Sequence, residues 1–226
     1  MNPSALLMLT AAAALLLASA SQARSSIEAG QGVGFALSLD TLQDRAETVF
    51  HTLTETPADT EMTTTQQNIA AFLGMIREAE GTANSADPYA VCYAYRHTIR
   101  NFSNHPAVTG EWKGERLSDA MCSNAGFGPG CISSAAGAYQ IIKPTWASVA
   151  AALGLGDFTP ASQDAAAIEL VRRRGALEDV KAGRIAQAIT KCRNEWASLP
   201  GNFAKQGQRS QGDLIAWYQQ NGGFTA

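Results

Sequence analysis

Apolar residues recur at steps of three and four positions through much of the chain, a spacing that gathers them on one face of an α-helix. The clearest stripe runs through residues 67–80 and consists of Ile69, Phe72, Leu73 and Ile76. It predicts an amphipathic helix that stops at the glycine after it. Helical periodicity together with start and stop signals predicts further helices over 144–153, 159–175, 184–196 and 210–220.

Two stretches between these helices have the composition of strands. The segments 89–95 (YAVCYAY) and 137–142 (GAYQII) contain the Tyr, Val and Ile that strands favour, and Gly, Asn, Ser and Pro separate them. A small sheet or hairpin beside the helices is therefore predicted. The expected fold class is α+β, mainly helical, with two lobes and a cleft between them.

The N-terminal third of the chain follows another pattern. Residues 1–23 hold an apolar run and then small residues at the spacing of a signal-peptidase site, which predicts a signal peptide. The run is shorter than the roughly 20 apolar residues of a permanent membrane span, but no Lys or Arg precedes it, which leaves an uncleaved anchor as the alternative. Residues 24–66 predict a linker or N-terminal extension with one helix over 35–53. The folded domain is expected over 67–226.

Composition narrows the class of protein. Hydrophobic residues make up 46% of the chain and charged residues 16%, which suits a globular core. The formal net charge of -3 lacks the basic excess of a nucleic-acid binder, so nucleic acid is not expected as a partner.

The four cysteines are an even number in a chain with an export signal, which favours disulfides. Three pairings are possible. Cys122 and Cys131 bracket a Gly- and Pro-rich loop, so this local pair forms most easily, and Cys92 with Cys192 then follows by exclusion. No CxxC occurs and the histidines show no ligand spacing to the cysteines, so no metal site is expected.

One acidic residue, Glu80, stands at the expected C-terminus of the first helix. The helix dipole leaves partial negative charge there, which repels a carboxylate. Either Glu80 is an exposed residue that tolerates the repulsion, or the repulsion is useful because it raises the pKa of the carboxyl. A carboxyl held protonated near neutral pH can serve as the general acid of a glycan-cleaving enzyme.

Five blocks of sequence carry a family resemblance. They read AFLGMIREAEGT, FSNHP, AAGAYQIIKPTW, GLGDFTPASQDAAAIELVRRRGAL and AGRIAQAITKCRNEWASLPG. In this order and wording they resemble the lambda-type phage endolysins, which are lysozyme-like lytic transglycosylases. The resemblance covers roughly residues 67–221 and implies a lysozyme-like fold that acts on peptidoglycan glycan strands.

The resemblance also implies a reaction. The β-1,4 bond between N-acetylmuramic acid and N-acetylglucosamine would be cleaved without water as the nucleophile. Glu80 matches the family's single catalytic acid: it would protonate the leaving oxygen, and its carboxylate would then help deprotonate the muramoyl C6 hydroxyl. That hydroxyl closes onto C1 to give a 1,6-anhydro product. No cofactor is expected.

Two alternatives stay open. A hydrolytic muramidase would need a second carboxylate as nucleophile or base. Glu78 projects from a different side of the helix than Glu80, so a partner would have to come from loop acids that fold over the cleft: Asp87, Glu111, Glu115 and Asp119. The second alternative is a non-catalytic glycan-binding module that keeps the cleft.

Further residues are expected along the cleft. Gly-x-Tyr-Gln strands line the cleft of lysozyme-like folds, so the resemblance assigns Gly137, Tyr139 and Gln140 to substrate binding, with the Gln140 amide on the sugar and Tyr139 packing beneath it. Ser198 is assigned to the cleft rim. Core or turn roles are expected for Trp146, Trp196 and His105.

The chain departs from the family at two places. Residues 107–134 form a longer segment than the family's corresponding one and either extend or cover the groove. The other departure is the predicted export signal, which implies an enzyme of the periplasm or a secreted one. It would remodel peptidoglycan locally, for example for a secretion or conjugation apparatus, or belong to a phage with a signal-anchor export route.

Overall fold

The computed structural model describes residues 63–202 and 207–226. They belong to one compact unit, Glu61–Ala226. The predicted signal peptide, almost all of the predicted linker and the helix expected over 35–53 lie outside the described residues. None of the helices in the described part of the chain is long and apolar enough to cross a membrane.

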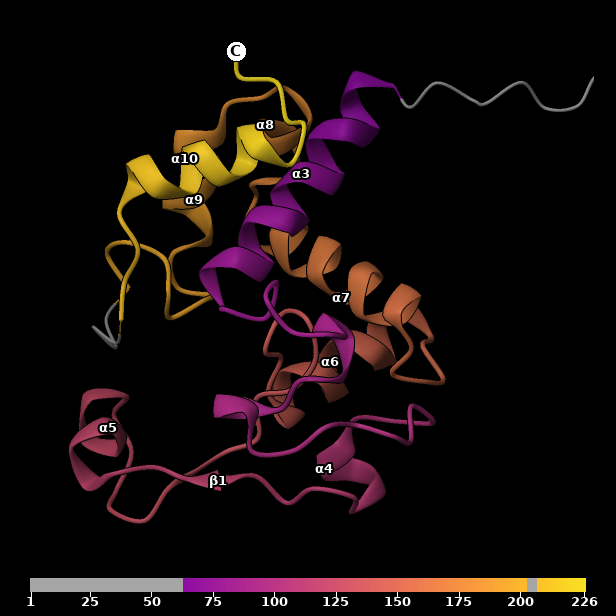
Figure 1. The fold of residues 1–226 in the computed structure, drawn as a ribbon, viewed down its shortest axis with the longest axis vertical. Helices are drawn as coiled ribbons and strands as arrows, with labels where there is room; N and C mark the ends of the chain where they lie inside the picture. Colours follow the sequence, from indigo (N-terminus) through magenta and orange to yellow (C-terminus); the bar gives the residue numbers. More distant parts are fainter. Residues whose placement is uncertain (1–62, 203–206) are drawn as a thin grey trace, which may run out of the picture. The chain divides into compact units, whose positions relative to one another are not determined.

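Helix α3 (Thr64–Ala79) is the helix predicted from the first apolar stripe, and it packs against α7, α8 and α10 (Figure 1). A capping box fixes its start: the Thr63 hydroxyl accepts the Gln66 N–H, and the Gln66 side chain accepts the Thr63 N–H at 2.9 Å. The helix therefore begins a little before the predicted residue 67. Its inward face is buried, and it ends directly before Glu80.

The remaining helices complete the helical part of the domain around α3. They are α6 (Lys143–Leu153), α7 (Pro160–Arg173), α8 (Leu177–Lys181), α9 (Ile185–Cys192) and α10 (Gln211–Gln220). Helix α9 is shorter than the predicted 184–196, because the chain turns after Cys192, where the Glu195 N–H bonds the Cys192 carbonyl. The turn leaves residues 194–197 free of helical geometry, and they line the groove described below.

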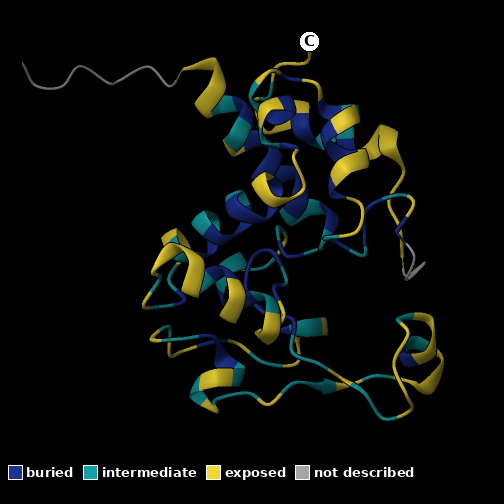
Figure 2. Ribbon diagram, turned by 180° about the vertical axis from the view of Figure 1, so that it is seen from behind, coloured by how far each residue is buried: buried dark blue, intermediate teal, exposed yellow. Residues whose placement is uncertain are grey.

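The smaller lobe is built mostly from turns and short helices. It contains η1 (Pro88–Ala90), η2 (Tyr93–Tyr95), α4 (Pro106–Thr109), β1 (Glu115–Arg116), α5 (Asp119–Asn124) and β2 (Ile132–Ser133). Strands β1 and β2 pair antiparallel, with Glu115 opposite Ser133. We call residues 107–134 the arm. Figure 1 shows β1 and α5 on this extended segment, and in Figure 2 it carries mostly intermediate and exposed residues.

The strands predicted over 89–95 and 137–142 do not form, so this prediction was wrong. Both segments make only isolated bridges, such as Cys92 with Ala136. The first cannot continue as a strand because Ala94 and Tyr95 adopt left-handed backbone, with φ of 51° and 57°. The second is interrupted in the same way by Gln140, with φ of 47°. The sheet forms in the arm instead, and the mainly helical α+β class is confirmed.

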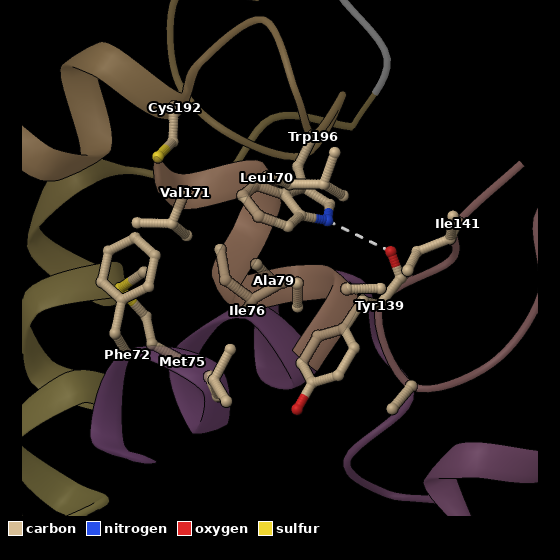
Figure 3. Packing of buried hydrophobic residues seen from close by; sticks show 14 of the residues in the cluster. Phe72, Met75, Ile76, Ala79, Tyr139, Ile141, Leu170, Val171, Cys192 and Trp196 are labelled. Atoms are coloured by element: carbon tan, nitrogen blue, oxygen red, sulfur yellow. Dashed lines mark hydrogen bonds between the residues drawn. The ribbon is translucent and has the colours of Figure 1, made fainter. Parts of the chain in front are cut away.

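The core lies between α3, α7 and α9 and extends under the 137–141 segment (Figure 3). Trp146 and Trp196 are both buried, as expected, and the Trp196 indole N–H donates to the Tyr139 carbonyl at 3.1 Å. His105 also confirms its expected turn role: its Nδ1 accepts the Ala107 N–H at the start of α4. This core holds the smaller lobe against the end of α3.

The cysteines pair only in part as predicted. Cys122 and Cys131 form a disulfide inside the arm. The predicted disulfide between Cys92 and Cys192 was wrong, because both thiols are free and fully buried. An even number of cysteines does not require every one to pair, because a free cysteine also serves as a small core residue. Burial raises the pKa of each of these two thiols to about 12, which keeps them protonated.

We expect peptide mapping under non-reducing conditions to find one bridge, Cys122–Cys131. A thiol reagent should modify Cys92 and Cys192 only after denaturation, because both are shielded in the core. Native protein treated with the same reagent is the control. A bridged peptide that contains Cys92 and Cys192 would contradict the structure.

Candidate active site

A groove of about 610 Å³ lies at the end of α3. The smaller lobe supplies one part of its wall, including Leu117, Ala125 and Ser133 of the arm. Residues 194–197 and Arg174 supply another part. Because arm residues line the groove, the arm extends its wall, one of the two roles left open by the sequence. Glu80 is among the lining residues.

Glu80 is the C-cap of α3 and is half-buried in this groove. The Ser198 hydroxyl donates a hydrogen bond of 2.6 Å to Glu80 Oε1. Burial raises the pKa of Glu80 to about 7, while the hydrogen bonds from Ser198 and the positive charge of Arg209 act in the opposite direction. The predicted direction of the pKa shift is confirmed, but desolvation is its largest cause.

Ser198, predicted to bind substrate at the rim, is a direct partner of the Glu80 carboxyl. It is 8% exposed and follows the turn after α9. Its hydroxyl reaches Glu80 across a sequence separation of 118 residues. A hydroxyl donor at this place orients the carboxyl and stabilises its ionised form.

Gln140, which the sequence assigns to substrate binding, lines the groove. Its side-chain amide N–H groups donate to the carbonyls of Val91 at 3.2 Å and Gly137 at 3.0 Å. With the amide hydrogens turned to the backbone, the side-chain carbonyl oxygen is the group left for a ligand. The left-handed backbone at Gln140 is a strained conformation of the kind that gathers at functional sites.

Tyr139 is fully buried, in the packing position expected for it. Its hydroxyl donates to Asp164 Oδ1 at 2.5 Å and accepts from Arg77 Nη1 at 2.9 Å. The Tyr89 hydroxyl also donates to Asp164, at 2.9 Å. Asp164 and Arg77 were not singled out in the sequence, where they look like ordinary charges on predicted helices. Their network anchors the 137–141 segment to α3 and α7.

Gly137, also assigned to substrate binding, packs closely against neighbouring side chains. It is not among the described residues that line the groove. A Cβ there would lie 2.1 Å from Gln163 Oε1, and Gly137 has φ of +76°. Glycine is therefore required by close packing and by backbone conformation, whatever contact a ligand makes.

The loop acids considered as second carboxylates have other partners. Glu111 accepts N–H groups from Arg100 at 2.8 Å and Asn101 at 3.1 Å. Glu115, on the arm, pairs with Arg96 at 3.6 Å. The other two bond nearby backbone: Asp87 accepts from the Tyr89 N–H and Asp119 from the Gly130 N–H.

Besides Glu80, one further carboxylate lines the groove among the described residues. This is Glu195, which Arg174 holds at 2.8 Å. Glu78, on the same helix as Glu80, is not among the lining residues. Within the described ranges no group of three or more His, Cys, Asp or Glu is arranged to hold a metal ion.

A mainly helical two-lobed domain with one carboxyl of near-neutral pKa in its groove defines a lysozyme-like site. The family model described as Endolysin matches residues 70–225. The protein therefore belongs to the endolysin family. Family and fold together make it a lysozyme-like enzyme that degrades peptidoglycan.

The known proteins that are similar to this chain include phage endolysins and a phage lysozyme. The endolysin of Escherichia phage P2 is 38% identical over 162 residues, which are 72% of this chain and 97% of the relative. The endolysin of Escherichia phage lambda is 37% identical over 153 residues, 68% of this chain and 90% of the relative. A solved structure of bacteriophage lambda lysozyme complexed with a chitohexasaccharide aligns with a TM-score of 0.59 and 33% identity, over 71% of this chain and 97% of that one.

Proposed function

We propose that the protein is a lytic transglycosylase that cleaves the MurNAc-β-1,4-GlcNAc bond of peptidoglycan and leaves a 1,6-anhydro-MurNAc end. The observation that carries the proposal is the isolation of Glu80. It is the groove carboxyl with a pKa raised to about 7, and the other described groove carboxylate, Glu195, is held by Arg174.

In this reaction Glu80 acts first as an acid. The protonated carboxyl gives its proton to the bridging oxygen, and the bond between that oxygen and C1 of N-acetylmuramic acid breaks. The C6 hydroxyl oxygen of the same sugar forms a new bond to C1, and the Glu80 carboxylate takes the hydroxyl proton. The carboxyl is restored without any water being consumed, and the nucleophile is supplied by the substrate at high effective concentration.

The protein groups around Glu80 support both halves of this cycle. Burial favours the protonated carboxyl that begins it. The Ser198 hydroxyl, 2.6 Å from Oε1, stabilises the carboxylate that follows proton donation. Gln140 would accept a hydrogen bond from a sugar hydroxyl or acetamide N–H, since its amide hydrogens are bonded to backbone. A glycan chain such as the chitohexasaccharide bound by lambda lysozyme is a suitable occupant of the groove.

Hydrolysis is the second candidate, and Glu195 is the residue that favours it. If Glu195 left Arg174, its carboxylate would lie in the same groove as Glu80 and could activate a water. The ion pair with Arg174 opposes this, because a carboxylate held by a guanidinium is a weaker base.

Export is proposed on the sequence of residues 1–23 alone. The enzyme would act in the periplasm or outside the cell, on glycan strands near its site of release. A secretion or conjugation apparatus is the partner that such local action would serve.

Weighing the products of a peptidoglycan digest tests the proposal. We expect muropeptides that end in 1,6-anhydro-MurNAc, lighter by one water than the hydrolytic products. The variant Glu195→Gln should give the same products at a similar rate. Reducing MurNAc ends together with loss of activity in Glu195→Gln would replace the proposal with a muramidase that uses Glu195.

A further inference from the structure

Arg209 lies beside the catalytic carboxyl without being part of the groove lining described above. It precedes the Ser210 cap of α10, and its Nε donates to the carbonyl of Ala79 at 3.2 Å. Its backbone N–H donates to the Ser198 carbonyl at 2.8 Å. Its guanidinium carbon lies 5.9 Å from the centre of the Trp217 ring, within the range of a cation–π contact.

These contacts join the two residues that matter most for Glu80. Ala79 is the last residue of α3 and directly precedes Glu80. Ser198 is the residue whose hydroxyl bonds the Glu80 carboxyl. One side chain and one backbone N–H of Arg209 therefore connect the carbonyl end of α3 with the loop that carries Ser198.

The carbonyl end of a helix favours a nearby positive charge, which its own last turn usually supplies. In α3 the last turn contains Arg77, but the Arg77 guanidinium donates to the Tyr139 hydroxyl. Arg209 comes instead from a segment 130 residues later and bonds the carbonyl at the helix end.

We propose that Arg209 is a positioning residue for Glu80: it caps α3 at Ala79, holds the Ser198 loop in place and sets a positive charge beside the Glu80 carboxyl. This role rests on the proposed function of Glu80 as acid and base. It adds a residue that neither the reaction nor the groove required.

The other charged and titratable groups around Glu80 come from several elements of the domain. From the 137–141 segment, the Tyr139 hydroxyl is bonded to Asp164. From the turn after α9, Glu195 is paired with Arg174. Glu78 precedes the site on α3, and from the smaller lobe Tyr93 lines the groove while the Tyr95 hydroxyl donates to the Gly81 carbonyl.

The positive charge of Arg209 lowers the pKa of Glu80, against the larger effect of burial. Removing that charge should therefore raise the pKa and keep the carboxyl protonated to higher pH. The descending alkaline limb of the activity profile should then move upward.

Two variants separate charge from hydrogen bonding. Arg209→Gln keeps a donor for the Ala79 carbonyl but removes the charge, whereas Arg209→Lys keeps the charge and loses the planar fork. In Arg209→Gln we expect the alkaline limb and the Glu80 titration, followed by carboxyl NMR, to move up by about 0.5 of a pH unit. In Arg209→Lys both should stay within about 0.2 of a unit of the parent. An unchanged titration in Arg209→Gln would overturn the proposal.

The salt dependence of the Glu80 titration is a second test, which does not require Arg209→Gln to fold. Arg209 is an exposed residue, so its charge is screened by added salt. The Glu80 titration of the unaltered protein should therefore move upward between low and high salt, and an unmoved titration would also overturn the proposal. The NMR titration needs no turnover, so it tests Arg209 even if the product analysis shows that the proposed transglycosylase reaction is wrong.

Discussion

Glu80→Gln is expected to lower peptidoglycan cleavage by about 10²–10⁴-fold, the usual contribution of a general acid. The amide has nearly the shape of the carboxyl and can still accept the Ser198 hydroxyl hydrogen bond, so the groove should persist. What is lost is the proton for the leaving oxygen and the base for the C6 hydroxyl. A turbidity assay on purified peptidoglycan measures the loss.

Glu78→Gln is the matched control, because Glu78 stands on the same helix but is not among the described groove residues. It should keep near-normal activity. If Glu80→Gln were as active as Glu78→Gln, Glu80 would have no role in the reaction.

The same variant should make the folded protein more stable above neutral pH. The folded-state pKa of Glu80 is raised from 4.5 to about 7, so its stabilising contribution is complete below about 4.5 and is lost as pH rises through 7. At pH 8 the ionised carboxyl costs about 3 kcal/mol relative to a neutral group. Glu80→Gln should thus unfold at higher denaturant concentration than the parent at pH 8, and at a similar concentration at pH 4.

Activity of the parent should follow the same titration. The acid form of Glu80 starts the reaction, so the rate should fall as pH rises through about 7. Gain of stability with loss of activity in one variant marks a residue that is kept for the reaction and not for the fold.

Gly137→Ala is expected to destabilise the domain by about 3–5 kcal/mol. The new Cβ would lie 2.1 Å from Gln163 Oε1 and 3.0 Å from the Phe158 ring. Gln163 cannot move freely, because it accepts the Ala138 N–H at 2.9 Å and donates to the carbonyls of Tyr89 and Phe158. Chemical denaturation monitored by circular dichroism measures the change.

Gly154→Ala is the control for backbone conformation. Gly154 has φ of +67°, close to the +76° of Gly137, but nothing lies within 4 Å of its Cβ position. It should lose only about 1 kcal/mol, the cost of left-handed backbone in a residue with a side chain. Equal losses in the two variants would show that packing against Gln163 contributes nothing.

The sequence was informative where the determining interactions are local. The stripe of Ile69, Phe72 and Ile76 predicted α3 because helical periodicity is a property of consecutive residues. The Cys122–Cys131 bridge was predicted for the same reason, since its loop is short. The resemblance to a known family supplied the fold and singled out Glu80 from Glu78, which the helix pattern alone did not do.

The sequence was uninformative where distant segments meet. Strand-like composition at 89–95 did not reveal that Ala94 and Tyr95 turn the backbone to positive φ. The partners of Glu80 come from segments more than 100 positions away: Ser198 at a separation of 118, and Arg209, whose bond to Ala79 spans 130. In the sequence Arg209 is only a cation before a helix cap, because its role depends on tertiary contacts.

The arm contains a disulfide, whereas the cysteines outside the arm are free, so only the arm depends on oxidation. Cys92 and Cys192, which lie outside the arm, are buried free thiols, so reductants leave the packing around them unchanged. The one covalent cross-link fastens the arm, which supplies Leu117, Ala125 and Ser133 to the groove wall. Glu80 and its support are therefore complete in a reducing environment, whereas the far wall of the groove is secured only after the chain meets an oxidant.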